Sequence, residues 1–215
     1  MDKEKVLSRI RECGIVAVVR ANDADQALRI AEACMKGGVA GIELTYTVPG
    51  ITGIIEKLAQ EYKGSEDFII GAGTVLDEET ARAAILAGAQ YVVSPYFRPE
   101  MVKLCNRYRT AVMPGAMTIK EVAEVMESGA DIAKIFPGEL FGPKIIKAIS
   151  GPLPHARMMP TGGVTVDNAA EWIKAGAVAL GAGSSLTGGT KTGDYDSITT
   201  TARKFIEEIK RARGL

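Results

Sequence analysis

Two charged residues that lie in apolar segments are the first candidates for chemistry. Lys134 lies in the run Ile-Ala-Lys-Ile-Phe, and Glu43 lies in the run Gly-Ile-Glu-Leu-Thr. An apolar environment disfavours the charged form of lysine, and a neutral amine can attack a ketone to form a Schiff base. A carboxylate beside it could act as a general acid or base. The alternatives are a solvent-exposed Lys134, or a purely structural ion pair of Glu43 with Lys134 or Arg20.

Arg20 and two glycine-rich loops could bind the anionic groups of a substrate. Arg20 ends the apolar run IVAVVR, where its guanidinium could hold a carboxylate, although a surface arginine at a strand end explains the residue by itself. The loops Thr161-Gly162-Gly163 and Gly181-Ala182-Gly183-Ser184 follow two later apolar runs. Bare backbone amides near a helix N-terminus bind phosphate in barrel enzymes, whereas glycine also serves ordinary tight turns.

Eight short apolar runs would position these residues. The runs begin near residues 15, 41, 68, 91, 111, 132, 157 and 177, and each is bounded by Gly or Pro. Most of them are nearly continuous in apolar residues, which is typical of strands that are covered on both faces. A polar residue at the end of such a strand is therefore a candidate site residue.

Helical patterns fill most of the gaps between the predicted strands. They cover residues 24–36, 77–87, 118–128, 167–175 and 198–213, with a short candidate at 144–149. Repeated strand–helix units predict parallel strands, and eight of them favour an α/β fold of the (β/α)8 TIM-barrel type in one domain, residues 1–215. Met1–Glu12 would form an extra N-terminal helix across the bottom. The alternative is an open doubly wound sheet, but no complete GxGxxG follows the first strand.

The composition argues against several other classes of protein. The 26 basic and 26 acidic residues give a formal net charge of zero, which argues against a nucleic-acid partner or an anionic membrane surface. No apolar run approaches the roughly 20 residues of a membrane span, and Met1–Glu12 lacks the apolar core of a signal peptide. Three scattered Cys and the single His155 predict reduced thiols, a cytoplasmic protein and no metal site.

The motifs also form a recognisable series along the chain: GIELT, GAGTV, SP, MPG, AKIFPGE, PTGGV and GAGSSL. As a set they resemble the bacterial 2-keto-3-deoxy-6-phosphogluconate (KDPG) aldolases, which overlap with the 4-hydroxy-2-oxoglutarate (KHG) aldolases. The resemblance covers essentially the whole chain. It implies a class I pyruvate aldolase on a (β/α)8 barrel that forms a homotrimer and uses no metal or other cofactor.

The same resemblance implies a role for each candidate residue. Lys134 would be the Schiff-base lysine, and Glu43 the general acid/base. The pyruvate pocket would be lined by Thr74, Pro95, Phe136 and Thr161, and the phosphate would be bound by Gly162, Gly163, Gly183 and Ser184. Some members of the family carry an arginine soon after the E-x-T motif, where this chain has Thr47. Other members place an arginine at the end of the first strand, so the contact with the substrate carboxylate is assigned to Arg20.

The implied reaction is cleavage of a small 2-keto acid. Lys134 would form an imine at C2, the C3–C4 bond would break, and glyceraldehyde 3-phosphate and then pyruvate would be released. KHG would be a further substrate, giving pyruvate and glyoxylate. A phosphosugar isomerase or epimerase, or a non-catalytic phosphate-binding barrel, remains the alternative, because a fold does not determine a function. An epimerase would not need an imine-forming lysine at position 134.

Overall fold

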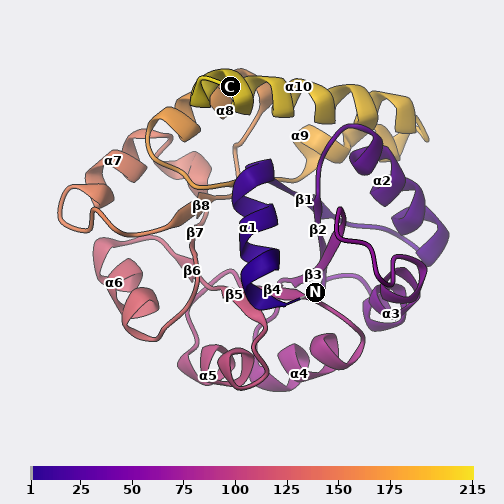
Figure 1. The fold of residues 1–215 in the computed structure, drawn as a ribbon, viewed down its shortest axis with the longest axis horizontal. Coiled ribbons are helices and arrows are strands. Elements are labelled where there is room, and N and C mark those ends of the chain that lie inside the picture. Colours follow the sequence, from indigo (N-terminus) through magenta and orange to yellow (C-terminus); the bar gives the residue numbers. More distant parts are fainter. Residues whose placement is uncertain (1) are drawn as a thin grey trace.

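Parallel strands alternate with helices along the chain in the computed structural model, which describes residues 2–215 (Figure 1). The strands in this part of the chain are β1 (Ile15–Val19), β2 (Gly41–Thr45), β3 (Ile69–Gly73), β4 (Tyr91–Val93), β5 (Ala111–Met113), β6 (Gly115–Ala116), β7 (Ala133–Ile135), β8 (Met158–Pro160) and β9 (Leu180–Ala182). They form two parallel sheets, ordered β5-β4-β3-β2-β1-β9 and β6-β7-β8.

The two sheets are halves of one closed barrel. β5 and β6 are the two parts of a single extended segment, separated only by Pro114, which has no amide hydrogen to donate. β5 pairs with β4, and β6 pairs with β7. On the other side, Thr161 forms a parallel bridge with Gly181, and the amide of Val178 donates to the carbonyl of Met158 at 2.9 Å. The ring therefore has eight segments, which confirms the predicted (β/α)8 barrel.

Most of the helices surround this ring, as Figure 1 shows. The helices of the described chain are α1 (Lys3–Cys13), α2 (Ala24–Lys36), α3 (Ile51–Glu61), α4 (Glu78–Leu86), α5 (Pro99–Arg107), α6 (Ile119–Glu127), α7 (Lys144–Ser150), α8 (Val166–Lys174), α9 (Ser184–Thr187) and α10 (Tyr195–Arg213), with the 3₁₀ turns η1 (Gly138–Leu140) and η2 (Gly188–Lys191). None of the helices within residues 2–215 is both long and apolar enough to cross a membrane.

Local sequence signals set the helix ends. Thr118 and Glu121 form the expected capping box at the start of α6, and Gly129 follows its last turn with φ of 77°. The last helix begins three residues earlier than predicted, at Tyr195. The side chain of Asp194 accepts a hydrogen bond from the amide of Ser197 at 2.9 Å and so caps this earlier start.

The first helix covers one end of the barrel, as predicted; Met1, where the predicted helix began, lies outside the described residues. In Figure 1, α1 lies across the middle of the ring. Its buried residues Val6, Leu7 and Ile10 belong to the same apolar cluster as Val16 and other residues inside the barrel. Gly14, with φ of 76°, turns the chain directly from α1 into β1. Because α1 closes the N-terminal ends of the strands, their C-terminal ends form the open face of the barrel.

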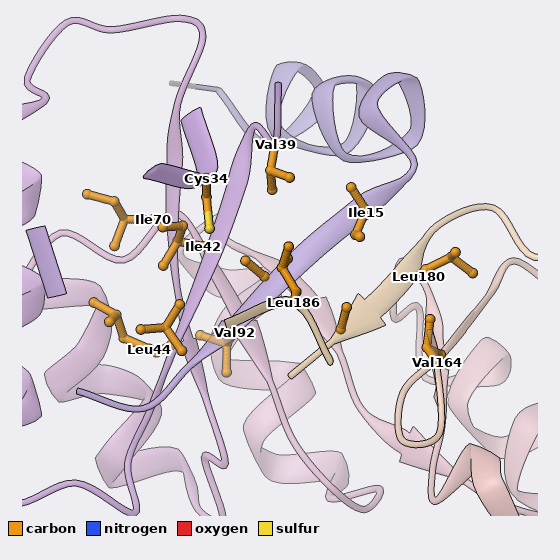
Figure 2. Packing of buried hydrophobic residues seen from close by; sticks show 14 of the residues in the cluster. Ile15, Cys34, Val39, Ile42, Leu44, Ile70, Val92, Val164, Leu180 and Leu186 are labelled. Atoms are coloured by element: carbon orange, nitrogen blue, oxygen red, sulfur yellow. The ribbon is translucent and has the colours of Figure 1, made fainter. Parts of the chain in front are cut away.

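A larger apolar cluster lies between the strands and the outer helices. Figure 2 shows part of it, including Ile42 and Leu44 of β2 beside Cys34 and Ile70. Side chains alternate between the two faces of a strand. Since the side chains of Ile42 and Leu44 point outward to the helices, those of Glu43 and Thr45 point into the barrel. The cysteines Cys13, Cys34 and Cys105 are all free thiols.

Candidate active site

Lys134 and Glu43 meet inside the barrel. Glu43 is paired in register with Val18 on β1, and Lys134 with Met159 on β8. The Nζ atom of Lys134 lies 3.9 Å from Oε1 of Glu43, and their side chains are only 6% and 1% exposed. The prediction that both residues point into one shared space is therefore confirmed, and an exposed Lys134 is excluded.

The environment of Glu43 suits a group that exchanges protons. Burial raises the pKa of Glu43 above its ordinary value, while the positive charges of Lys134 and Arg20 act in the opposite direction. Within residues 2–215, neither carboxylate oxygen of Glu43 has a hydrogen-bond partner. A carboxyl group with a raised pKa and free oxygens can give and take protons closer to neutral pH than an ordinary glutamate can.

Glycines inside the strands make room for large side chains in the interior. The ring of Tyr91 lies against Gly71, and the hydroxyl of Thr161 lies against Gly181, so that a Cβ atom at either glycine would overlap its neighbour. Tyr91 is fully buried and belongs to the interior apolar cluster with Val16, in the layer nearer α1. These glycines therefore carry no chemistry themselves, but they determine which side chains the barrel can hold.

The four residues predicted to line a pyruvate pocket follow or end strands at the open face. The ring centroid of Phe136 lies 4.9 Å from Nζ of Lys134. Thr161 is buried, and its Oγ1 has no partner among the described residues. Thr74 has φ of 54°, a left-handed conformation that costs a threonine roughly 1–3 kcal/mol and is enriched at functional sites. The carbonyl of Pro95 packs on Gly115 of β6.

Thr45 is a further polar residue inside the barrel and is not among the candidates from the sequence. Thr45 is fully buried, and its Oγ1 lies 3.0 Å from Oγ1 of Thr47. It follows Glu43 by two residues and therefore points inward as well. This spacing in the E-x-T motif was the signal that could have identified it.

The predicted phosphate loops have the expected open backbone. Gly162 and Gly163 have φ of 92° and 68°, a region that favours glycine. The side chain of Glu139 packs against both of them, and a Cβ atom at Gly163 would come within 2.7 Å of the Cβ of Glu139. A Cβ atom at Gly183, in contrast, would meet no atom within 4 Å. Position 183 therefore faces open space beside the exposed Ser184.

Arg20 and Ser184 line one cavity of about 520 Å³ at the end of β1. From the sequence, Arg20 is expected at the carboxylate end of a substrate and Ser184 at its phosphate end. A larger cavity, of about 710 Å³, lies near the N-terminal ends of β3 and β4, beside Tyr62 and Leu86. It lies at the end of the barrel that α1 covers, whereas the cavity of Arg20 opens at the C-terminal end of β1; neither Lys134 nor Glu43 lines either of the two cavities. Within residues 2–215, no three His, Cys, Asp or Glu side chains gather as metal ligands would.

Known proteins resemble this chain over nearly its whole length. A family model described as "KDPG and KHG aldolase" matches residues 6–201. The 2-dehydro-3-deoxy-phosphogluconate aldolase of Treponema pallidum (strain Nichols) is 32% identical over 208 residues, which cover 95% of this chain and 96% of that protein. The 2-dehydro-3-deoxy-6-phosphogalactonate aldolase of Escherichia coli (strain K12) is 35% identical over 173 residues, covering 80% and 83%.

A solved structure agrees with these sequence relatives. The KDPG aldolase of Legionella pneumophila, with pyruvate captured at low pH as a covalent carbinolamine intermediate, matches with a TM-score of 0.84 and 26% identity. The match covers 92% of this chain and 96% of that one.

Proposed function

The chain belongs to the KDPG and KHG aldolase family, whose members are class I aldolases, and on this premise we propose that it cleaves KDPG to pyruvate and glyceraldehyde 3-phosphate. KHG is proposed as a second substrate, giving pyruvate and glyoxylate. The observation that carries the proposal is the buried pair of Lys134 and Glu43, with 3.9 Å between amine and carboxylate. An isomerase would have no use for an imine-forming lysine at this place.

In the proposed reaction Lys134 is the nucleophile. The ammonium of Lys134 first gives up a proton, and the neutral Nζ attacks C2 of the substrate to form a carbinolamine. The carbinolamine takes up a proton and loses water, which gives a cationic imine. The cation withdraws electrons from C3, so the C3–C4 bond can break when the C4 hydroxyl loses its proton. Glyceraldehyde 3-phosphate then leaves, and an enamine of pyruvate remains on Lys134.

Glu43 is the proposed acid and base for these proton transfers. It takes the proton of the C4 hydroxyl, either directly or through a water molecule, and its raised pKa makes it able to return a proton to C3 of the enamine. Hydrolysis of the resulting imine releases pyruvate and restores the amine of Lys134. All bonds made to the enzyme are broken again, and no metal or organic cofactor is required by any step.

The remaining predicted residues are proposed to bind the two ends of the substrate. Thr74, Pro95, Phe136 and Thr161 surround the pyruvate part, and the contact between Phe136 and Lys134 supports this. The loops with Gly162, Gly163, Gly183 and Ser184 are proposed to receive the phosphate. For Arg20 the cavity shared with Ser184 supports a contact with the distal phosphate in place of the carboxylate expected from the sequence.

A substrate panel with coupled detection of pyruvate tests the proposal. The panel contains KDPG, its galactonate epimer and KHG, because the family includes enzymes named for each of them. We expect the highest kcat/KM with KDPG and measurable cleavage of KHG. A higher kcat/KM for the galactonate epimer would replace the proposed substrate, and release of pyruvate from none of the three would reject the aldolase activity.

We also propose that the protein is a homotrimer, as the family resemblance implies. Exposed apolar side chains follow four neighbouring strands of the open face and support an association between copies: Leu76, Tyr96, Met117, Ile119, Leu140 and Phe141. Sedimentation at micromolar protein concentration checks the proposal, and a monomer under these conditions would reject it.

A further inference from the structure

The cavity at the end of β1 carries two positive charges. Arg20 comes from the end of β1, and Lys191 is the last residue of η2. No aspartate or glutamate lines the cavity, and only one of its lining residues, Val18, is a large apolar residue. A cavity with this lining is suited to an anion, because its net charge is positive and its side chains offer hydrogen-bond donors.

Neither cation is neutralised within the described chain. No carboxylate oxygen of residues 2–215 lies within 4 Å of the guanidinium of Arg20 or the ammonium of Lys191. The hydroxyl of Thr190, which also lines the cavity, is buried and has no hydrogen-bond partner. Unpaired donors around one hollow are the arrangement expected when a ligand supplies the acceptors.

The cavity is also connected electrostatically with the catalytic pair. Val18 is the register partner of Glu43, and Arg20 follows Val18 by two residues, directly after the end of β1. The positive charge of Arg20 is close enough to lower the pKa of Glu43, although the effect of burial is larger. A substrate that is held by Lys134 at C2 can therefore extend towards the end of β1 with its distal group.

We propose that Lys191 is a specificity-determining residue, which selects a dianionic phosphate at the distal end of the 2-keto acid. The inference rests on the proposed aldolase function and deepens it. A phosphate monoester carries a charge of about −1.5 to −2 at neutral pH and offers three terminal oxygens, whereas a carboxylate carries only −1. Arg20 alone can balance a carboxylate. The second cation is needed only for the dianion, and the hydroxyls of Ser184 and Thr190 supply further donors.

Steady-state kinetics of Lys191→Met with two substrates tests this inference. We expect KM for KDPG to rise about tenfold or more, since a charge-assisted contact is lost. KM for KHG, which has no phosphate, and imine formation with pyruvate should change by less than about twofold. Lys191→Arg keeps the charge and should keep most of the preference. The control Lys204→Met removes an exposed lysine of α10 and should leave both KM values unchanged.

Inorganic phosphate gives a second measurement that does not depend on KDPG turnover. It should inhibit cleavage of KHG competitively, and its inhibition constant should rise in Lys191→Met but not in Lys204→Met. Equal KM values for KDPG in the wild type and Lys191→Met would overturn the inference while the aldolase function stands. A wild-type enzyme that cleaves KHG but not KDPG, and is not inhibited by phosphate, would overturn both the proposed substrate and the role of Lys191.

Discussion

The carboxyl group of Glu43 occupies the space that a side chain at Gly73 would fill. A Cβ atom built on Gly73 would overlap Oε1 of Glu43 and come within 2.5 Å of its Cγ and Cδ atoms. Gly73 is paired in register with Thr45, which lies two residues closer to the open face than Glu43. The carboxylate thus leans across β3 towards the open end, and the absence of a side chain at position 73 is what allows this.

We therefore expect Gly73→Ala to impair catalysis more than stability. The new methyl group displaces the carboxylate from its place 3.9 Å from Nζ of Lys134, and kcat should fall by about tenfold or more, since a small misplacement of a reacting group is costly. The control is Gly53→Ala in α3, where a Cβ atom meets nothing within 4 Å. It should keep full activity and gain about 0.5–1 kcal/mol of stability. An unchanged kcat in Gly73→Ala would show that the position of Glu43 is not critical.

A covalent adduct should form at Lys134 and at no other lysine. When the protein is incubated with pyruvate and reduced with borohydride, mass spectrometry of its peptides should place the adduct on Lys134, because this amine is buried beside a carboxylate. Lys134→Met should show no adduct and no activity, whereas Lys144→Met, which removes an exposed lysine of α7, should behave as the wild type. EDTA should leave the activity intact. An adduct on another lysine would reject the mechanism.

Glu43→Gln should separate imine formation from turnover. The amide keeps the size of the side chain but cannot transfer a proton, and kcat should fall by about 10²–10⁴, the usual worth of general acid–base catalysis. The borohydride-trapped adduct with pyruvate should still form. If Glu43→Gln instead lowers the folded fraction and leaves the activity per folded molecule unchanged, the role of Glu43 is structural.

The buried pair of Glu43 and Lys134 should make the stability of the folded protein depend on pH. Burial raises the pKa of Glu43 above its ordinary value of 4.5, so the ionised carboxylate lowers the stability of the folded state at neutral pH. As the pH falls towards 4.5, Glu43 is protonated in the folded protein at a higher pH than in the unfolded chain. The destabilising effect of its buried charge on the folded state therefore decreases. Lys134→Met removes the compensating charge and should cost on the order of 1–3 kcal/mol at pH 7, and less at pH 5.

Adding Glu43→Gln to Lys134→Met should restore most of the stability at pH 7, because the unpaired buried charge is then gone. Denaturant unfolding of the single and double variants, at one protein concentration and at both pH values, measures these differences. An equal loss at pH 7 and pH 5 without rescue in the double variant would mean that Lys134→Met acts by changing the packing of the interior.

The pattern of apolar residues alone predicted most of the barrel. Strands that are covered on both faces are nearly continuous in apolar residues, whereas the helices between them have apolar residues on one face only. The predicted helices leave out the two outer helices α3 and α5. For α5 the signals are present, since Pro99 opens the helix, Arg107 lies in its last turn, and Met101, Val102 and Cys105 are buried on one face. α3 begins Ile-Thr-Gly-Ile-Ile, which has a glycine and β-branched residues in place of strong helix formers, and it is stabilised by packing of Ile51, Ile54 and Ile55. The pattern likewise predicted one strand near Ala111, where Pro114 divides the ladder into β5 and β6.

The site was predictable to the extent that side-chain alternation determines it. Lys134 and Glu43 were found because a charge in a buried strand has few explanations. Their separation of 3.9 Å depends on closure of the ring, which brings β2 and β7 to opposite sides of a narrow interior. The width of this interior cannot be obtained from the sequence. Lys191 lies in a polar turn with no periodicity, so only its position in the cavity with Arg20 distinguishes it from other surface lysines.

The last prediction concerns the backbone at Gly183. A side chain at this position meets no protein atom within 4 Å, so it would extend into the space that the phosphate is proposed to use and would leave the core undisturbed. We expect Gly183→Val to raise KM for KDPG by about tenfold or more, the ratio that corresponds to about 1.4 kcal/mol. Cleavage of KHG should change much less, because its distal carboxylate is shorter and reaches this loop poorly. Equal losses with both substrates would show that Gly183 shapes the barrel end and does not hold the phosphate.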